Sequence, residues 1–254
     1  MLLGKRLMDV DPFAPRVFDD VLPPALLEVL SVAAAVLPNR TLSFWTGLDA
    51  PEPPLIATVL RHLKALVGLP QLERPDAGVE WWVRRAPAYH FQPWHVDKDE
   101  ALFMRDGVVR PPAAASILYL SDAGGATIFS SQVCDQEGAA LVPRRLERAW
   151  TIAPRRNRFV VARGDAVHAV LPSREHAQQV RTSMPINWWP SPMVSNARLA
   201  TEAADHEALA QLTDTPVPAE RSNPVPVPLR TWYAADLPRP VEQRWPAWKA
   251  APQA

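Results

Sequence analysis

The sequence predicts a mainly β fold with flanking helices, in which a double-sheet jelly-roll barrel is braced by helices on its N-terminal side. Of the 254 residues, 48% are hydrophobic, which suits one large domain with appendages. From Val79 to Trp189, short runs rich in Val, Ile, Tyr, Trp and Thr alternate with turn residues, a pattern typical of antiparallel sheets. Two stretches with helical spacing of apolar residues precede this region.

The two N-terminal stretches are predicted to be amphipathic helices. Two prolines near the start of the first stretch, Val21 to Leu37, suit a first helical turn. The second stretch begins near Pro54 and ends around Gly68 and Pro70. The apolar positions with helical spacing are Leu26, Leu27, Leu30, Ala33, Ala34 and Leu37 in the first helix, and Ile56, Val59, Leu60, Leu63 and Val67 in the second.

Eight strands are predicted after these helices, which is the strand number of a double-sheet jelly roll. They are Glu80 to Arg84, Ala88 to His95, Ala115 to Ser121, Ala126 to Ser130, Arg148 to Ile152, Arg158 to Ala162, Ala166 to Leu171 and Gln179 to Trp188.

The chain is predicted to divide near residue 190. Residues 1–190 form one domain, with a helical brace over residues 1–75 and the β core over residues 79–189. In residues 191–254, the segment Ala197 to Leu212 has a helical composition. Spaced prolines after it, from Pro216 to Pro228, are typical of an extended or wrapped tail and not of a second domain.

Composition excludes several classes of function. Acidic and basic residues balance at 27 each, and the sequence has no run of Lys or Arg that could bind along a phosphate backbone. Nucleic acid is therefore not the expected partner. Cys134 is the only cysteine, which excludes an internal disulfide and a thiolate zinc site. The N-terminal residues lack a signal-peptide pattern, and the most apolar window is too short to span a bilayer. We therefore expect a cytoplasmic protein without a membrane segment.

His95 and Asp97 form the first candidate metal-binding pair. In a strand, residues two apart leave the same face, so this imidazole and carboxylate can bind one ion. Taken alone, the pattern is weak evidence, and a surface histidine beside a solvated acid is the better interpretation of it. His168, on a later strand after the turn Arg163 to Asp165, is the candidate third ligand, and its alternative is a hydrogen-bonded core histidine. Two histidines and one carboxylate bind iron(II) from one side and leave the opposite positions open.

Arg181 and Ser183 are candidates for binding an anion on the following strand. They share one face, and a guanidinium inside an apolar barrel requires an anionic partner. The alternative is a surface arginine on a sheet edge. Arg174 is a competing candidate, but it lies in a polar segment that is predicted to be an exposed loop.

Together, His95-x-Asp97, His168 and then Arg181 on the next strand resemble the pattern of the Fe(II)/2-oxoglutarate-dependent dioxygenase superfamily. The segment from Ile117 to Phe129, with its paired glycines, is similar to the strand-turn-strand of that family. The N-terminal helices are similar to those of the prolyl 4-hydroxylase-like branch. That branch usually holds 2-oxoglutarate with a lysine, whereas Arg181-x-Ser183 resembles the small-molecule oxidase and synthase branch, which leaves the substrate class open.

The resemblance implies a double-stranded β-helix and an oxidoreductase that uses Fe(2+), 2-oxoglutarate and O2. It implies that His95, Asp97 and His168 bind iron, that Arg181 and Ser183 bind 2-oxoglutarate, and that succinate and carbon dioxide are released. Tyr89 and Tyr119 are further candidates for the cosubstrate site, because a phenol near the cosubstrate carboxylate recurs in the superfamily.

The substrate is expected to be a small molecule or a peptidyl residue, which is hydroxylated or otherwise oxidised. The loops from Lys98 to Pro112 and from Cys134 to Arg145 are predicted to select it. Two alternatives remain open at this point. One is a cupin-like metalloenzyme that does not use 2-oxoglutarate, and the other is a non-catalytic metal-binding barrel that acts as a binding module.

Overall fold

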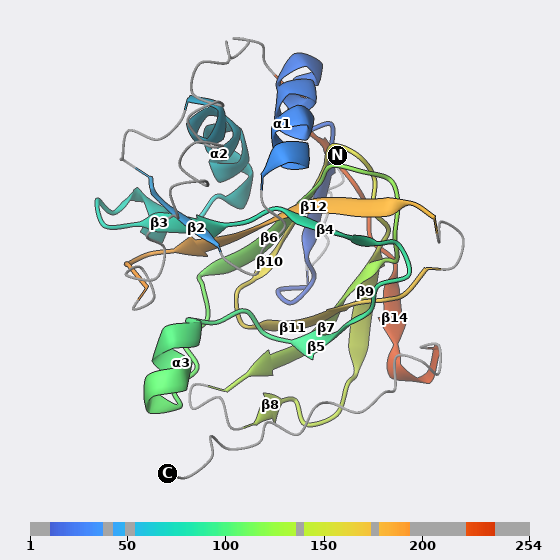
Figure 1. The fold of residues 1–254 in the computed structure, drawn as a ribbon. Helices are drawn as coiled ribbons and strands as arrows, with labels where there is room; N and C mark the ends of the chain where they lie inside the picture. Colours follow the sequence, from blue (N-terminus) through green and yellow to red (C-terminus); the bar gives the residue numbers. More distant parts are fainter. Residues whose placement is uncertain are drawn as a thin grey trace, which may run out of the picture.

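Two antiparallel sheets packed against each other form the body of the protein (Figure 1). The computed structural model describes residues 11–37, 43–48, 54–135, 140–173, 178–193 and 222–236. Within these residues, one sheet has eight strands and the other has six. The predicted mainly β, double-sheet architecture is therefore confirmed.

The larger sheet has the strand order β13-β1-β10-β6-β12-β3-β2, and β4 also pairs with β12. Its strands are β1 (Arg16–Asp19), β2 (Phe44–Gly47), β3 (Gly78–Trp81), β4 (Arg84–Pro87), β6 (Ala114–Tyr119), β10 (Arg158–Arg163), β12 (Val180–Trp189) and β13 (Val225–Pro226).

The smaller sheet has the order β14-β9-β7-β11-β5, and β8 pairs with β7. Its strands are β5 (Gln92–His95), β7 (Thr127–Cys134), β8 (Leu141–Val142), β9 (Arg148–Ile152), β11 (Ala166–Val170) and β14 (Thr231–Tyr233). From β9 onward the chain alternates between the sheets: β10 and β12 lie in the larger, β9 and β11 in the smaller. This crossing between two facing sheets is the predicted double-stranded β-helix.

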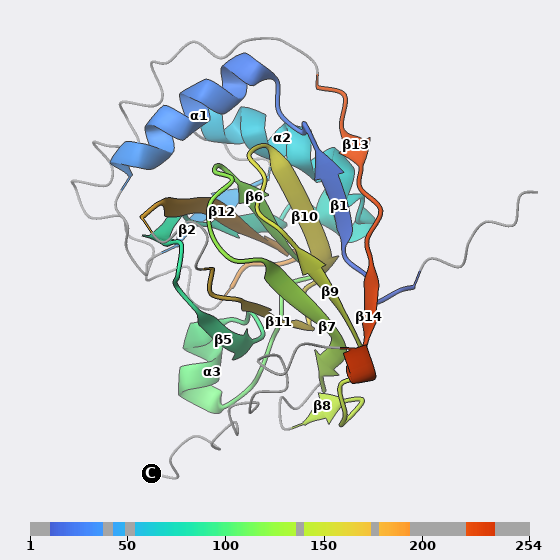
Figure 2. The same ribbon diagram turned by 90° about the vertical axis from the view of Figure 1, so that its right-hand side faces the viewer.

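Two helices cover the outer face of the larger sheet, as predicted (Figure 2). They are α1 (Pro24–Val36) and α2 (Pro54–Val67), and their buried side chains share one core cluster with Leu118, Phe159 and Ile186 of the sheet. Gly68 ends α2 in the left-handed region, at φ +60°, followed by the 3-10 turn η1 (Pro70–Glu73). None of the described helices is long and apolar enough to cross a membrane.

The connection between β5 and β6 is not the loop that the sequence predicted. It contains a helix, α3 (Glu100–Asp106), between a side-chain cap and a left-handed glycine. Asp99 accepts a hydrogen bond from the Leu102 amide at 3.1 Å, and Gly107 lies at φ +70°. Asp99 also pairs with Arg110 at 2.7 Å, which fixes both ends of the segment.

The described part of the tail adds one strand to each sheet. β13 pairs with β1, and β14 pairs with β9, before the short turn η3 (Ala234–Asp236). The indole of Trp232 donates to Thr151 at 3.0 Å. Residues 222–236 therefore pack on the two sheets of the same chain. The helix predicted from Ala197 to Leu212 lies outside the described residues.

Asp19 joins β1 to the turn that precedes β10. Its carboxylate, 5% exposed, accepts hydrogen bonds from Arg155 at 2.5 Å and from Arg158 at 2.7 Å. Burial alone would raise the pKa of Asp19, but the hydrogen bonds and charges of Arg158 and Arg155 outweigh it and hold the pKa below its ordinary value.

Asp19→Asn is expected to lower the free energy of unfolding by about 3 kcal/mol at pH 7, because two arginines lose a buried partner. A folded-state pKa below the unfolded value means that this stability is present above about pH 4 and is lost as the pH falls through the folded pKa. Urea denaturation of both proteins from pH 7 downward measures this difference. The control is Asp106→Asn, which removes an exposed ion pair with Arg105. Equal losses of stability in the two variants would contradict the prediction.

Candidate metal centre and anion pocket

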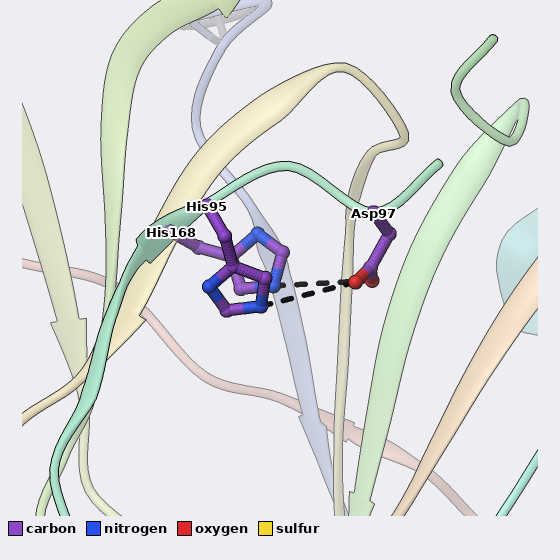
Figure 3. A group of neighbouring side chains, drawn as sticks. All are labelled: His95, Asp97 and His168. Atoms are coloured by element: carbon purple, nitrogen blue, oxygen red, sulfur yellow. Dashed lines mark ion pairs between the residues drawn. The ribbon is translucent and has the colours of Figure 1, made fainter. Parts of the chain in front are cut away.

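His95, Asp97 and His168 converge on one point between the two sheets (Figure 3). His168, on β11, lies directly opposite His95, on β5, in the antiparallel register, and Asp97 follows two residues after the end of β5. One ligand atom from each residue lies within 4.8 Å of the others. Asp97 places one oxygen 3.8 Å from Nε2 of His95 and the other 3.9 Å from Nε2 of His168.

The backbone fixes the tautomer of both imidazoles. Nδ1 of His95 lies 2.8 Å from the carbonyl oxygen of Pro93, and Nδ1 of His168 lies 3.0 Å from that of Ala166. A carbonyl oxygen only accepts, so each Nδ1 carries the proton and each Nε2 keeps its lone pair. The two lone pairs and the carboxylate face the same space, and this donor set suits iron(II).

Burial keeps His95 neutral. Its pKa is lowered to about 4, first by burial and then by the neighbouring imidazole of His168. The two rings are close, with centroids 4.2 Å apart, and Phe129 stacks on His168 from the other side at 5.3 Å. At neutral pH the His95 nitrogen is therefore available to a metal without loss of a proton.

A partly open cavity adjoins the side chains of His95, Asp97 and His168. The larger sheet and the link between β3 and β4 contribute Trp82, Arg84, Ile117, Arg181, Ser183 and Pro185. The smaller sheet contributes Gln92, Phe129 and Val170 beside the two histidines. The cavity therefore combines a metal-binding end with two guanidinium groups.

Arg181 is the more deeply buried of the two arginines, at 6% exposed. Its Nη2 donates to the Thr127 hydroxyl at 3.0 Å, but its Nε has no hydrogen-bond partner among the described residues. Ser183, at 1% exposed, likewise has an unpartnered hydroxyl among them. Buried polar atoms without partners are costly, and these two face one cavity, so the site fits a carboxylate that satisfies both.

Gly124 packs closely against the side chain of Arg181. A Cβ on this glycine would lie 2.5 Å from Cδ of Arg181, and its φ of +104° also favours glycine. Tyr119 supports the same arginine: its hydroxyl is 2.6 Å from the Thr127 hydroxyl, and its ring lies 5.2 Å from the guanidinium. The turn that contains Gly124 and the side chain of Tyr119 therefore hold Arg181 in place.

The two tyrosines that the resemblance suggested for the cosubstrate site, Tyr89 and Tyr119, are not among the residues that line the cavity. Tyr89 is 59% exposed, in the turn between β4 and β5. The structure thus does not bring Tyr89 to the cosubstrate site, because the strand predicted from Ala88 to His95 begins only at Gln92. Arg174 lies outside the described residues.

Several residues that line the cavity were not assigned to the site from the sequence, among them Trp82, Arg84 and Gln92. Trp82 and Arg84 are two residues apart, and this spacing could have suggested that their side chains point to the same face. Gln92 gave no such signal, because an irregularity in the pairing of β5 with β11 lies between it and His95, and its amide reaches Nε2 of His95 at 2.8 Å.

No protein-family model matches the sequence, and no curated protein matches it. Among solved structures, the fold is similar to a prolyl-4-hydroxylase from Pseudomonas putida, with 17% identity, a TM-score of 0.47, and coverage of 70% of this chain and 86% of that one. A 2OG-Fe(II) oxygenase family oxidoreductase from Burkholderia pseudomallei has 16% identity, a TM-score of 0.45, and coverage of 69% and 83%. HygX from Streptomyces hygroscopicus, with nickel and 2-oxoglutarate bound, has 14% identity, a TM-score of 0.45, and coverage of 75% and 87%.

Proposed function

We propose that the protein is an Fe(II)- and 2-oxoglutarate-dependent oxygenase that hydroxylates or otherwise oxidises a small-molecule or peptidyl substrate. The observation behind this proposal is the combination in one cavity of a two-histidine, one-carboxylate set with the unpartnered polar atoms of Arg181 and Ser183. A metal site alone would fit many enzymes. The buried anion site beside it favours a cosubstrate that chelates the metal at one end and carries a carboxylate at the other.

Each residue then has a defined task. His95, Asp97 and His168 hold the iron from one side, and the two Nδ1 hydrogen bonds keep the imidazoles oriented. Arg181 and Ser183 bind the distal carboxylate of 2-oxoglutarate, and Tyr119 with Thr127 positions the guanidinium. Iron(II) with 2-oxoglutarate and O2 supplies the oxidising equivalent, and the cosubstrate leaves as succinate and carbon dioxide.

Apolar side chains limit water around this centre. Phe129 lies against His168, and Ile117 and Val170 line the same cavity. Removal of water strengthens the pairing of Arg181 with an anion, because the effective dielectric constant falls. A cytoplasmic location is part of the proposal, since a single cysteine suits a reducing compartment.

Anaerobic addition of iron(II) and then 2-oxoglutarate to the metal-free protein tests this function. We expect a visible charge-transfer band from the chelated keto acid. Succinate, which lacks the ketone, is the matched control and should give no band. Bound iron without a band would reject 2-oxoglutarate and favour the cupin-like alternative. A band without succinate release in air, across a panel of acids, amino acids and peptides, would favour the binding module.

A further inference from the structure

The cavity contains a second guanidinium, Arg84, which the proposed function leaves without a task. Arg84 lies on β4, opposite Ser183 in the register with β12. Its Nη2 donates to Nε2 of His90 at 2.7 Å, which leaves its other N–H groups for the cavity. Among the described residues, no carboxylate forms an ion pair with Arg84 or Arg181. Burial and the charge of Arg181 lower the pKa of Arg84, so the two cations lie within range of each other.

Arg84 lies at the rim of the cavity and Arg181 in its interior. β4 and β5 each pair on one side only among the described strands, so they form facing open edges of the two sheets. Trp82, Arg84 and Gln92, which lie on or beside these edges, are partly exposed. Arg181 and Ser183, on the inner strand β12, are 6% and 1% exposed. A molecule that enters after 2-oxoglutarate therefore meets Arg84 first.

The charges of the loaded cavity leave a place for one more anion. With iron(II) and 2-oxoglutarate bound, the ion and the two arginines would carry four positive charges in total. Asp97 and the two carboxylates of the cosubstrate would carry three negative charges, which leaves a surplus of one positive charge. Glu80 is the nearby buried acid. Burial raises its pKa, and it bonds Ser43 at 2.6 Å and Asn187 at 3.3 Å instead of lining the cavity. A monoanion, and not a phosphate dianion, matches this surplus.

We propose that the primary substrate is an organic acid whose carboxylate binds Arg84 and Gln92, with its apolar part against Trp82. The planar fork of a guanidinium matches a carboxylate. Gln92 donates to Nε2 of His95, at 2.8 Å, and a metal ligated by that nitrogen releases the amide for the carboxylate. The proposal deepens the proposed function, and it rests on that function for the charge count and for calling the bound acid a substrate.

Benzoate and benzamide are matched probes for this site, because they share one ring and differ in charge. The cobalt(II) protein with excess 2-oxoglutarate is mixed with each probe, and the paramagnetic relaxation of the ring protons is measured by NMR. We expect the wild type to relax benzoate at least about tenfold more than benzamide. Arg84→Gln should remove this preference and Arg84→Lys should keep part of it. The 2-oxoglutarate affinity of the iron(II) protein should stay within about threefold in both variants.

Three outcomes would overturn the organic-acid site. The first is equal relaxation of both probes in the wild type, and the second is an unchanged preference for benzoate in Arg84→Gln. The third is a tenfold or greater loss of 2-oxoglutarate affinity in Arg84→Gln, which would assign Arg84 to the cosubstrate. Failure of the proposed function has a different signature, since the iron(II) wild type would show no charge-transfer band whatever the result with benzoate.

Discussion

His168→Ala is expected to lower the affinity for iron(II) by more than about 100-fold, since loss of a mere hydrogen-bond partner of a metal ligand costs about 10- to 100-fold. His168 is 6% exposed, and its Nε2 is one of the two nitrogens that face Asp97. The alanine variant keeps only two of the three protein ligands, one imidazole and one carboxylate. Iron(II) affinity is measured anaerobically by competition with a coloured chelator, and the charge-transfer band with 2-oxoglutarate should disappear at equal iron.

Two controls separate loss of the ligand from loss of the fold. His168→Gln retains side-chain volume between His95 and Phe129, so its unfolding midpoint should stay close to that of the wild type while iron affinity still falls. His62, on the outer helix α2, supplies a histidine outside the site, and His62→Ala should bind iron like the wild type. Wild-type iron affinity in a folded His168→Ala protein would remove this residue from the metal centre.

Local pattern predicted most of the fold. The helices α1 and α2 and the strand β9 were predicted within three residues, because apolar spacing and flanking prolines and glycines act over one element. The strands β1, β2, β13 and β14 were not predicted. They are two to four residues long and pair with strands far away in the sequence, so their formation depends on partners that local composition does not reveal.

The convergence of His95, Asp97 and His168 was easier to predict than the cavity around them. His95 and Asp97 are two residues apart, and His168 shares their face through a register that a double-sheet fold requires. Tyr89 was assigned from the family resemblance alone, but the chain turns between β4 and β5 and Tyr89 is 59% exposed. Arg84 belongs to the pocket because β4 is aligned with Ser183 on β12, about one hundred residues later, and no local pattern encodes that alignment.

Arg181→Gln is expected to weaken 2-oxoglutarate binding by about 100-fold while iron(II) affinity stays unchanged. The variant removes two charge-assisted hydrogen bonds from a buried carboxylate, a loss of about 3 kcal/mol. Arg181 is not one of the candidate metal ligands, so the variant should lower the affinity for 2-oxoglutarate without lowering the affinity for iron(II). Titration of the iron(II) protein with 2-oxoglutarate, followed at the charge-transfer band, gives the affinity. Unchanged binding in Arg181→Gln would assign the carboxylate to another cation, with Arg84 as the alternative.

A pair of glycine variants tests the same assignment without removing the charge. In Gly124→Ala, the new Cβ would lie 2.5 Å from Cδ of Arg181, and the guanidinium must move. Gly107 also has a positive φ, +70°, but a Cβ there meets nothing within 4 Å. Both variants add backbone strain, whereas only Gly124→Ala displaces Arg181. We therefore expect Gly124→Ala to lose at least about tenfold in 2-oxoglutarate affinity and Gly107→Ala to lose none. Equal affinities in the two variants would mean that the position of Arg181 does not determine cosubstrate binding.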